Sequence, residues 1–307
     1  MKVEDAEIPW DPIPVVVNCK GVVRYRTQAD GHGHFTIQGS TAQSEITPEK
    51  SNPRPETTSQ LVGCDVEADL PGFTSSTVTI LDNPNIGIIR LHPNSAASGS
   101  STSATTASVS KDGMKHFNNA RSEWINHNGK NAERELQKAV KSDSNFAEAW
   151  YELGRFQQSK DPQAALNSYQ KAAAADSKFI SPYEPIAELS AGQKKWQDVV
   201  NATSAALKLD PAGTPQILYL DAVGKFNLGQ VDDAEASARK SLAMDPQHVS
   251  PNTEQLLAVM LAGQGDLQGA LQHLQNSLTY IKSGPNLDII KQQIAQLQRA
   301  MPQDSSK

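Results

Sequence analysis

The fold of this chain is decided by residues 147–154, Ala-Glu-Ala-Trp-Tyr-Glu-Leu-Gly, and by residues 169–176, Tyr-Gln-Lys-Ala-Ala-Ala-Ala-Asp. Small and apolar side chains recur in both stretches at helical spacing. The unit closes on an Asp-Ser pair, and matching pairs follow a fixed period: Asp143-Ser144, Asp176-Ser177, Asp210-Pro211 and Asp245-Pro246. Spacings of 33, 34 and 35 residues predict stacked helix-turn-helix units that bury their apolar faces against one another.

This unit resembles the tetratricopeptide repeat. The family's signature positions are matched by Trp150, Leu153, Gly154, Ala165, Tyr169 and Ala172. Ser177 stands where the family has Pro, and the turn around Asp161-Pro162 is one residue short. The resemblance implies an α-solenoid with a groove and no built-in chemistry.

Further units are expected at 113–146, 180–213, 215–248 and 251–284, although Asp221 stands where Leu is expected. An unrelated helical bundle is the alternative. We expect an array of four to five repeats over 111–284. A capping helix follows over 285–301, because solenoid ends need a polar outer face. A frayed tail is expected over 302–307.

Residues 13–93 change to an alternating, β-rich pattern that predicts a small antiparallel β-sandwich. Two segments, Asp30-Gly-His-Gly-His-Phe-Thr-Ile37 and Cys64-Asp-Val-Glu-Ala-Asp-Leu-Pro-Gly-Phe73, resemble the carboxypeptidase regulatory-like domain, a transthyretin-like sandwich without catalytic residues. The family's opening Gly-x-Val strand has no counterpart in the arm 1–12. That strand is therefore expected to be missing, replaced or supplied by another chain.

The Ser/Thr/Ala-rich tract 94–110 predicts a flexible linker between the two parts. The chain is thus expected to be a multidomain protein, with a β-sandwich followed by an all-α solenoid.

Cys19 and Cys64, the only cysteines, both fall in the β-rich region. A disulfide is the preferred interpretation, and two buried thiols are the alternative. A disulfide implies an oxidising compartment, periplasmic or extracellular. The segment Met1–Asp5 is acidic and shows no apolar signal core.

Composition excludes several classes of protein. Residues 1–108 carry 7 Lys+Arg against 12 Asp+Glu, and the remainder carries 21 against 22, so neither half suits nucleic acid. No apolar run is long enough to predict a membrane span.

No catalytic or cofactor motif is recognised, so we expect a non-enzyme without cofactor or metal. His32-Gly33-His34, with Asp30, is too short and glycine-rich to fix a zinc site and is interpreted as a polar hairpin.

In the tetratricopeptide family the first helix of each unit lines the groove. Carried over by position, the partner groove is expected to contain Phe117, Arg121, Trp124, Tyr151, Arg155, Glu184, Glu188, Tyr219 and Phe226. Arg121, Arg155 and Glu188 share one repeat position and predict a ladder that suits an acidic peptide segment. The alternative is that Arg155 pairs with Glu188 and the aromatic residues pack between units.

We therefore expect an exported, non-enzymatic adaptor or scaffold that binds protein or peptide partners. One alternative is a subunit that polymerises into a filament through its arm and β domain. A second is an accessory subunit of an envelope polysaccharide or peptidoglycan enzyme complex.

Overall fold

The computed structural model describes residues 2–3, 13–19, 22–29, 34–35, 37, 61–68, 73–81, 88–93, 99–100, 103–245, 252–281 and 285–301. The chain forms two compact units. Unit 1 comprises Met1–Glu152 and Ala174–Ser181, and unit 2 comprises Leu153–Ala173 and Pro182–Lys307.

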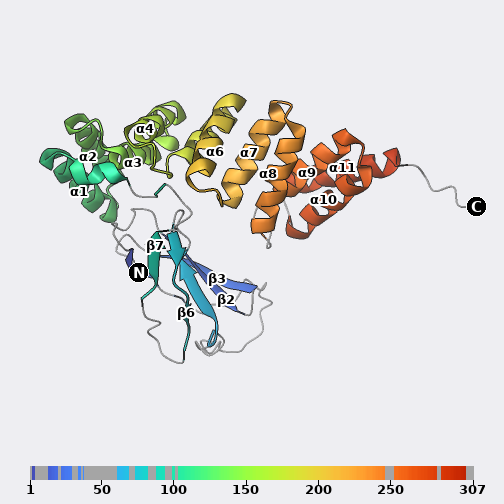
Figure 1. The fold of residues 1–307 in the computed structure, drawn as a ribbon, viewed down its shortest axis with the longest axis horizontal. Coiled ribbons are helices and arrows are strands. Elements are labelled where there is room, and N and C mark those ends of the chain that lie inside the picture. Colours follow the sequence, from blue (N-terminus) through green and yellow to red (C-terminus); the bar gives the residue numbers. More distant parts are fainter. Residues whose placement is uncertain are drawn as a thin grey trace, which may run out of the picture. The chain divides into compact units, whose positions relative to one another are not determined.

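The described strands of the β-rich region form two sheets (Figure 1). One sheet is antiparallel, has the order β3-β2-β4-β6, and contains β2 (Ile13–Cys19), β3 (Val22–Ala29), β4 (Asp65–Ala68) and β6 (Val78–Thr79). The other has the order β1-β7-β5 and contains β1 (Lys2–Val3), β5 (Phe73–Ser75) and β7 (Arg90–Pro93). The antiparallel sheet expected from the alternating pattern is confirmed.

The two sheets share one hydrophobic core. Alternation along β2 buries Ile13, Val15 and Val17, while Pro14 is exposed. Val15 and Val17 stand opposite Ala68 and Val66 of β4. Leu91 of β7 belongs to the same buried cluster, so side chains from both sheets exclude water together.

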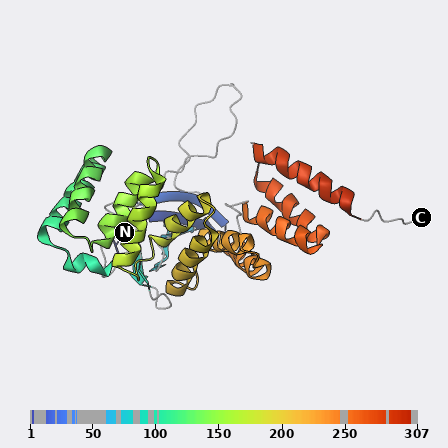
Figure 2. The ribbon, with the colours of Figure 1, turned by 90° about the horizontal axis from the view of Figure 1, so that it is seen from above.

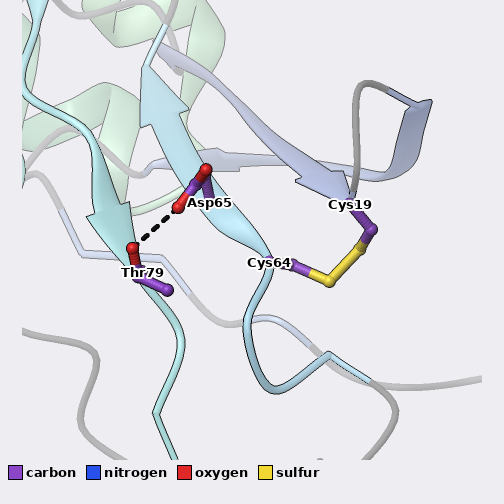
Figure 3. The surroundings of a disulfide bond; sticks show 4 residues. All are labelled: Cys19, Cys64, Asp65 and Thr79. Carbon is purple, nitrogen blue, oxygen red and sulfur yellow. Dashed lines mark hydrogen bonds between the residues drawn. A yellow bond between two sulfur atoms is a disulfide. The ribbon is translucent and has the colours of Figure 1, made fainter.

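A disulfide joins Cys19, at the end of β2, to Cys64, just before β4 (Figure 3). The two Cα atoms are 4.4 Å apart, within the range that a disulfide spans. Beside it, Thr79 Oγ1 donates a hydrogen bond of 2.7 Å to Asp65 Oδ1, from β6 to β4. The predicted disulfide is confirmed, and the alternative of two free thiols is not what the structure shows.

The start of the arm pairs with its own chain. Lys2 and Val3 form β1, which runs parallel to β7, with Lys2 opposite Arg90 and Val3 opposite Leu91. A short strand from the arm is therefore supplied by the same chain. The rest of the arm, residues 4–12, lies outside the described residues.

The rest of the described chain is helical (Figures 1 and 2). The helices are α1 (Lys111–Ile125), α2 (Gly129–Ser142), α3 (Ala147–Gln158), α4 (Pro162–Ala175), α5 (Tyr183–Gly192), α6 (Trp196–Leu209), α7 (Pro215–Asn227), α8 (Val231–Met244), α9 (Asn252–Gln264), α10 (Leu267–Tyr280) and α11 (Pro285–Ala300). Neighbouring helices pack as hairpins, α1 on α2, α5 on α6, α7 on α8 and α9 on α10. This is the helix-turn-helix repeat that the period predicts.

The turns inside these hairpins share a left-handed residue. It is His127 between α1 and α2, Lys194 between α5 and α6, Gly229 between α7 and α8, and Gly265 between α9 and α10. A left-handed φ costs little for Gly but more for other residues. The α3–α4 turn, residues 159–161, has no such residue.

The solenoid of unit 2 ends in α11. Its Ile290 is fully buried in a cluster with Ala258, Leu261, Ala270 and Leu274, and Ile294 and Leu297 pack against that cluster. Its remaining positions are largely exposed. The helix therefore covers the apolar face of the last hairpin and presents polar residues outward.

Gly154 of α3 makes the close helix crossing that its signature position predicts. A Cβ added there would lie 2.8 Å from the ring of Tyr169 on α4. Because Tyr169 is fully buried, its ring has little room to move. We expect Gly154→Ala to lower the free energy of unfolding by about 1–3 kcal/mol, measured by urea denaturation.

Gly263→Ala in α9 is the matched control. A Cβ there meets nothing within 4 Å, so the same change should be neutral or stabilise by about 0.4–1 kcal/mol. Equal effects of the two substitutions would contradict a packing role for Gly154.

Candidate functional site

Unit 2 places two of the predicted groove carboxylates one turn apart on α5, facing the start of α7. Glu184 is half-buried, and its Oε2 lies 3.5 Å from Thr214 Oγ1. Glu188 is exposed, and its Oε1 accepts a 3.2 Å hydrogen bond from Gln216 Nε2. Because α5 packs against α7, this surface joins two consecutive repeats.

Among the described residues, the two carboxylates have no positively charged partner. Burial raises the pKa of Glu184, and the nearby charge of Glu188 raises it further, while the Thr214 hydroxyl opposes the shift. Within the described part of the chain no Lys or Arg forms an ion pair with either carboxylate. Like charges at i and i+4 repel, so a cation brought by a ligand would stabilise the pair.

The first helix of the following repeat, α7, carries two of the aromatic residues predicted for the groove. Tyr219 of α7 is half-buried, and burial raises the pKa of its hydroxyl. Phe226 is half-buried as well, and packs against the cluster that includes Ala222 and Leu257. Part of Phe226 therefore belongs to the core, and the exposed part remains available for contact.

The prediction for Phe117 is wrong. Phe117 of α1 is 3% exposed and packs on Phe146, with ring centroids 4.6 Å apart. It is a core residue because Phe146, in the turn before α3, covers the ring that the repeat alignment assigned to the groove. Trp124, at the end of α1, is 45% exposed. Tyr151 is half-buried and meets the ring of Phe179 edge-on, at 5.4 Å.

The arginine ladder stays a prediction. Arg121 lies on α1 in unit 1 and Arg155 on α3 in unit 2, both half-buried. Glu188, the alternative partner of Arg155, accepts a hydrogen bond from Gln216.

The predicted flexible linker is wrong for its described residues. Residues 99–100 and 103–110, here called the strap, lie along the turns of the first repeats. Ser103 Oγ donates to Asp176 Oδ2 at 2.7 Å, Ser103 N–H donates to Glu148 Oε1 at 3.0 Å, and Ser110 N–H donates to Asp143 Oδ2 at 2.9 Å. A short 3₁₀ helix spans Ala104–Ser108. Side-chain hydroxyls and backbone N–H groups cannot form a hydrophobic core. In the strap they donate hydrogen bonds to carboxylates of the helical repeats instead.

Sequence reasoning missed other polar residues of the helical part. Thr214 and Gln216 were not singled out, although Thr214 before Pro215 is a recognisable N-cap signal. Asp221 was noted as a departure from the repeat pattern. The structure shows it 1% exposed, with Thr203, Lys225 and Ser237 as partners.

Metal and membrane chemistry gain no support from the described residues. Among them, no group of three or more His, Cys, Asp or Glu side chains is placed to hold a metal ion. No described helix combines the length and apolar character needed to cross a membrane. His34 is exposed, and His32 and Asp30 lie outside the described part of the chain.

Comparison with known proteins identifies the helical fold. No protein-family model and no curated protein sequence matches the chain. Among solved structures, YrrB, described as a TPR protein with an unusual peptide-binding site, is 18% identical over 62% of this chain and 98% of its own, with a TM-score of 0.52. PilW, described as a widely conserved type IV pilus biogenesis factor, is 18% identical over 62% and 88%, with a TM-score of 0.50. The helical part therefore has the fold of tetratricopeptide repeat proteins.

Proposed function

We propose that the protein is a non-enzymatic adaptor. It binds a protein partner on the surface that the first helix of each repeat contributes. The observation that carries this proposal is the pair Glu184 and Glu188, which is partly desolvated and forms no ion pair with a described Lys or Arg, on a repeat fold. Tyr219 and Phe226 lie on α7, the first helix of the following repeat. Together they suit a peptide segment with a Lys or Arg followed by apolar side chains.

The arginine positions extend the proposal to a segment of mixed charge. Arg121 and Arg155 would bind carboxylates of the partner, as the shared repeat position predicts. Neither arginine is required for the basic residue that Glu184 and Glu188 would receive, so the two sets of residues can be tested by separate mutations.

The β-rich region supports an exported location in the periplasm or outside the cell. Its disulfide between Cys19 and Cys64 is typical of oxidising compartments. We propose that its two sheets form the sandwich of a carboxypeptidase regulatory-like domain, which supplies a non-catalytic module. Their common core supports this assignment.

We expect Glu184→Gln/Glu188→Gln to weaken binding of the partner about tenfold or more. Each lost charge-assisted hydrogen bond is worth about 1.5–3 kcal/mol at a desolvated contact. Partners are first captured with the wild-type chain, and their affinities are then measured by calorimetry. Unchanged affinity for every captured partner would contradict the proposal.

Two controls separate binding from folding. Asp198→Asn, an exposed charge on α6 of the same repeat, should leave binding intact. Glu184→Gln alone should stabilise the protein by about 0.2–0.5 kcal/mol at neutral pH, because it relieves a like-charge pair. Since the folded-state pKa of Glu184 is raised, its ionisation disfavours folding as pH rises above the unfolded value of 4.5. The advantage of Gln should therefore vanish below pH 4.5, where Glu184 is protonated in both states.

A further inference from the structure

Two of the periodic aspartates hold the strap in the same way. Asp143 Oδ1 accepts the Asn145 N–H of its own turn at 3.0 Å, and Asp143 Oδ2 accepts the Ser110 N–H of the strap at 2.9 Å. Asp176 Oδ1 accepts the Lys178 N–H of its own turn at 3.0 Å. Asp176 Oδ2 accepts the Ser103 hydroxyl at 2.7 Å and the Ala104 N–H at 2.9 Å. One oxygen thus shapes the turn, and the other binds an extended segment.

The strap adds backbone pairing to these carboxylate contacts. Ser100 N–H donates to the Lys178 carbonyl at 2.9 Å, and Ile180 N–H donates to the Ser100 carbonyl at 2.8 Å. Ser100 and Phe179 form a parallel β-bridge. A Ser/Thr-rich segment is therefore recognised along a repeat edge by a carboxylate and by the backbone that follows it.

In unit 2, Asp210 makes the same bond within its own turn as Asp143 and Asp176 make in theirs. It closes α6, as Asp143 closes α2. Its Oδ1 accepts the Ala212 N–H of its own turn at 3.2 Å. The residue is 9% exposed. Its second oxygen has no hydrogen-bond partner among the residues that the structure describes.

Asp210 Oδ2 is not among the buried side-chain atoms that lack a partner in the described chain, so water reaches it and a ligand could replace that water. At Asp143 and Asp176 the equivalent oxygen is satisfied by the strap. The chemistry that satisfies it there is a backbone N–H, alone or together with the hydroxyl of the preceding residue.

We propose that Asp210 is a second binding site of the helical array, which takes an extended Ser/Thr-rich segment of a partner protein. The segment places a Ser or Thr hydroxyl and the following backbone N–H on Asp210 Oδ2. This site lies at the turn between α6 and α7, and its test uses a peptide without the basic residue that the proposed groove requires, so it does not depend on that groove.

The probe is a labelled peptide with the strap sequence of residues 99–110, Gly-Ser-Ser-Thr-Ser-Ala-Thr-Thr-Ala-Ser-Val-Ser. The chain's own strap holds Asp143 and Asp176 at an effective concentration of about 1 mM or more, so a micromolar peptide leaves those sites filled. We expect saturable binding to the full chain by fluorescence polarisation. Asp210→Asn should weaken it about tenfold, since Asn keeps the acceptor for Ala212 but loses the second charged oxygen.

Peptide variants keep the test independent of folding. Changing the peptide's Ser103 to Ala removes the hydroxyl, and changing its Ala104 to Pro removes the N–H, so each should weaken binding to the unaltered protein. The variant Glu184→Gln/Glu188→Gln should bind the peptide normally. Three results would each overturn the proposal. They are no saturable binding up to about 1 mM, binding that responds to Asp176→Asn but not to Asp210→Asn, and self-association of the chain that is lost in Asp210→Asn.

Discussion

Removal of the Cys19–Cys64 disulfide should destabilise the β-rich region by about 4 kcal/mol. The bridge closes a loop with a sequence separation of 45 residues, and the chain-entropy gain of the unfolded state grows with that length. The bridge ties the end of β2 to the residue before β4. Small domains with short strands depend strongly on such links.

Hydrogen exchange with mass spectrometry is the direct measurement, because it reports on each region of the full chain separately. After reduction, or in Cys19→Ala/Cys64→Ala, peptides covering residues 13–29 and 61–68 should lose protection. Peptides of α5–α11 serve as the internal control and should not change. Retained protection of β2 and β4 in the double variant would show that the shared core alone holds the sheets together.

The repeat period was the part of the fold most open to prediction. Asp-Ser or Asp-Pro pairs every 33 to 35 positions indicate the length of one helical hairpin. The small residue where the two helices of a hairpin cross follows from their close packing. Gly154 shows this directly, since Tyr169 occupies the space that a side chain would need. The disulfide was predictable for a different reason: two cysteines in one β region leave a single possible pairing.

The strap could not be found from composition. Ser, Thr and Ala give no apolar period, and its partners are remote in sequence, 33 residues from Ser110 to Asp143 and 73 from Ser103 to Asp176. Two of the four Asp residues that define the period, Asp143 and Asp176, also hold the strap. Their role in binding a second segment is invisible until the chain is folded.

The candidate site was predicted in part. Glu184, Glu188 and Tyr219 were chosen by counting repeat positions and stay a prediction, whereas Phe117, chosen by the same count, is buried. The count assumes that every unit exposes the same face. In the first unit Phe146 covers Phe117, and no local pattern around Phe117 indicates this contact.

Asp221 is the other residue whose replacement should have a large effect. It occupies the position where the repeat pattern expects Leu, and it is 1% exposed. Its Oδ1 accepts a 2.8 Å hydrogen bond from Thr203 Oγ1 on α6. Its Oδ2 accepts from Ser237 Oγ on α8 at 2.6 Å and lies 2.6 Å from Lys225 Nζ, one turn along α7. The carboxylate thus links three consecutive helices.

We expect Asp221→Ala to lower the free energy of unfolding by about 3–5 kcal/mol, because it leaves the partly buried Lys225 ammonium without its counter-charge and the Ser237 hydroxyl without its carboxylate acceptor. The measurement is urea denaturation followed by circular dichroism, with hydrogen exchange to locate the loss in α6–α8. Lys225→Met alone should also destabilise the chain, since it leaves the buried carboxylate uncompensated. A small effect of both single substitutions would contradict the network.

The double variant Asp221→Leu/Lys225→Met decides what the network contributes. It restores the Leu of the repeat pattern and removes both charges, so it should recover most of the lost stability, as replaced buried ion pairs often do. Ser237 would keep the difference from wild type above zero, because its hydroxyl loses the Asp221 carboxylate, whereas the Thr203 hydroxyl still has the Val200 carbonyl as an acceptor. Recovery to within about 1 kcal/mol of wild type would mean that the charges determine which helices pack together rather than how strongly. Loss as large as in Asp221→Ala would mean that the ion pair itself stabilises the repeat.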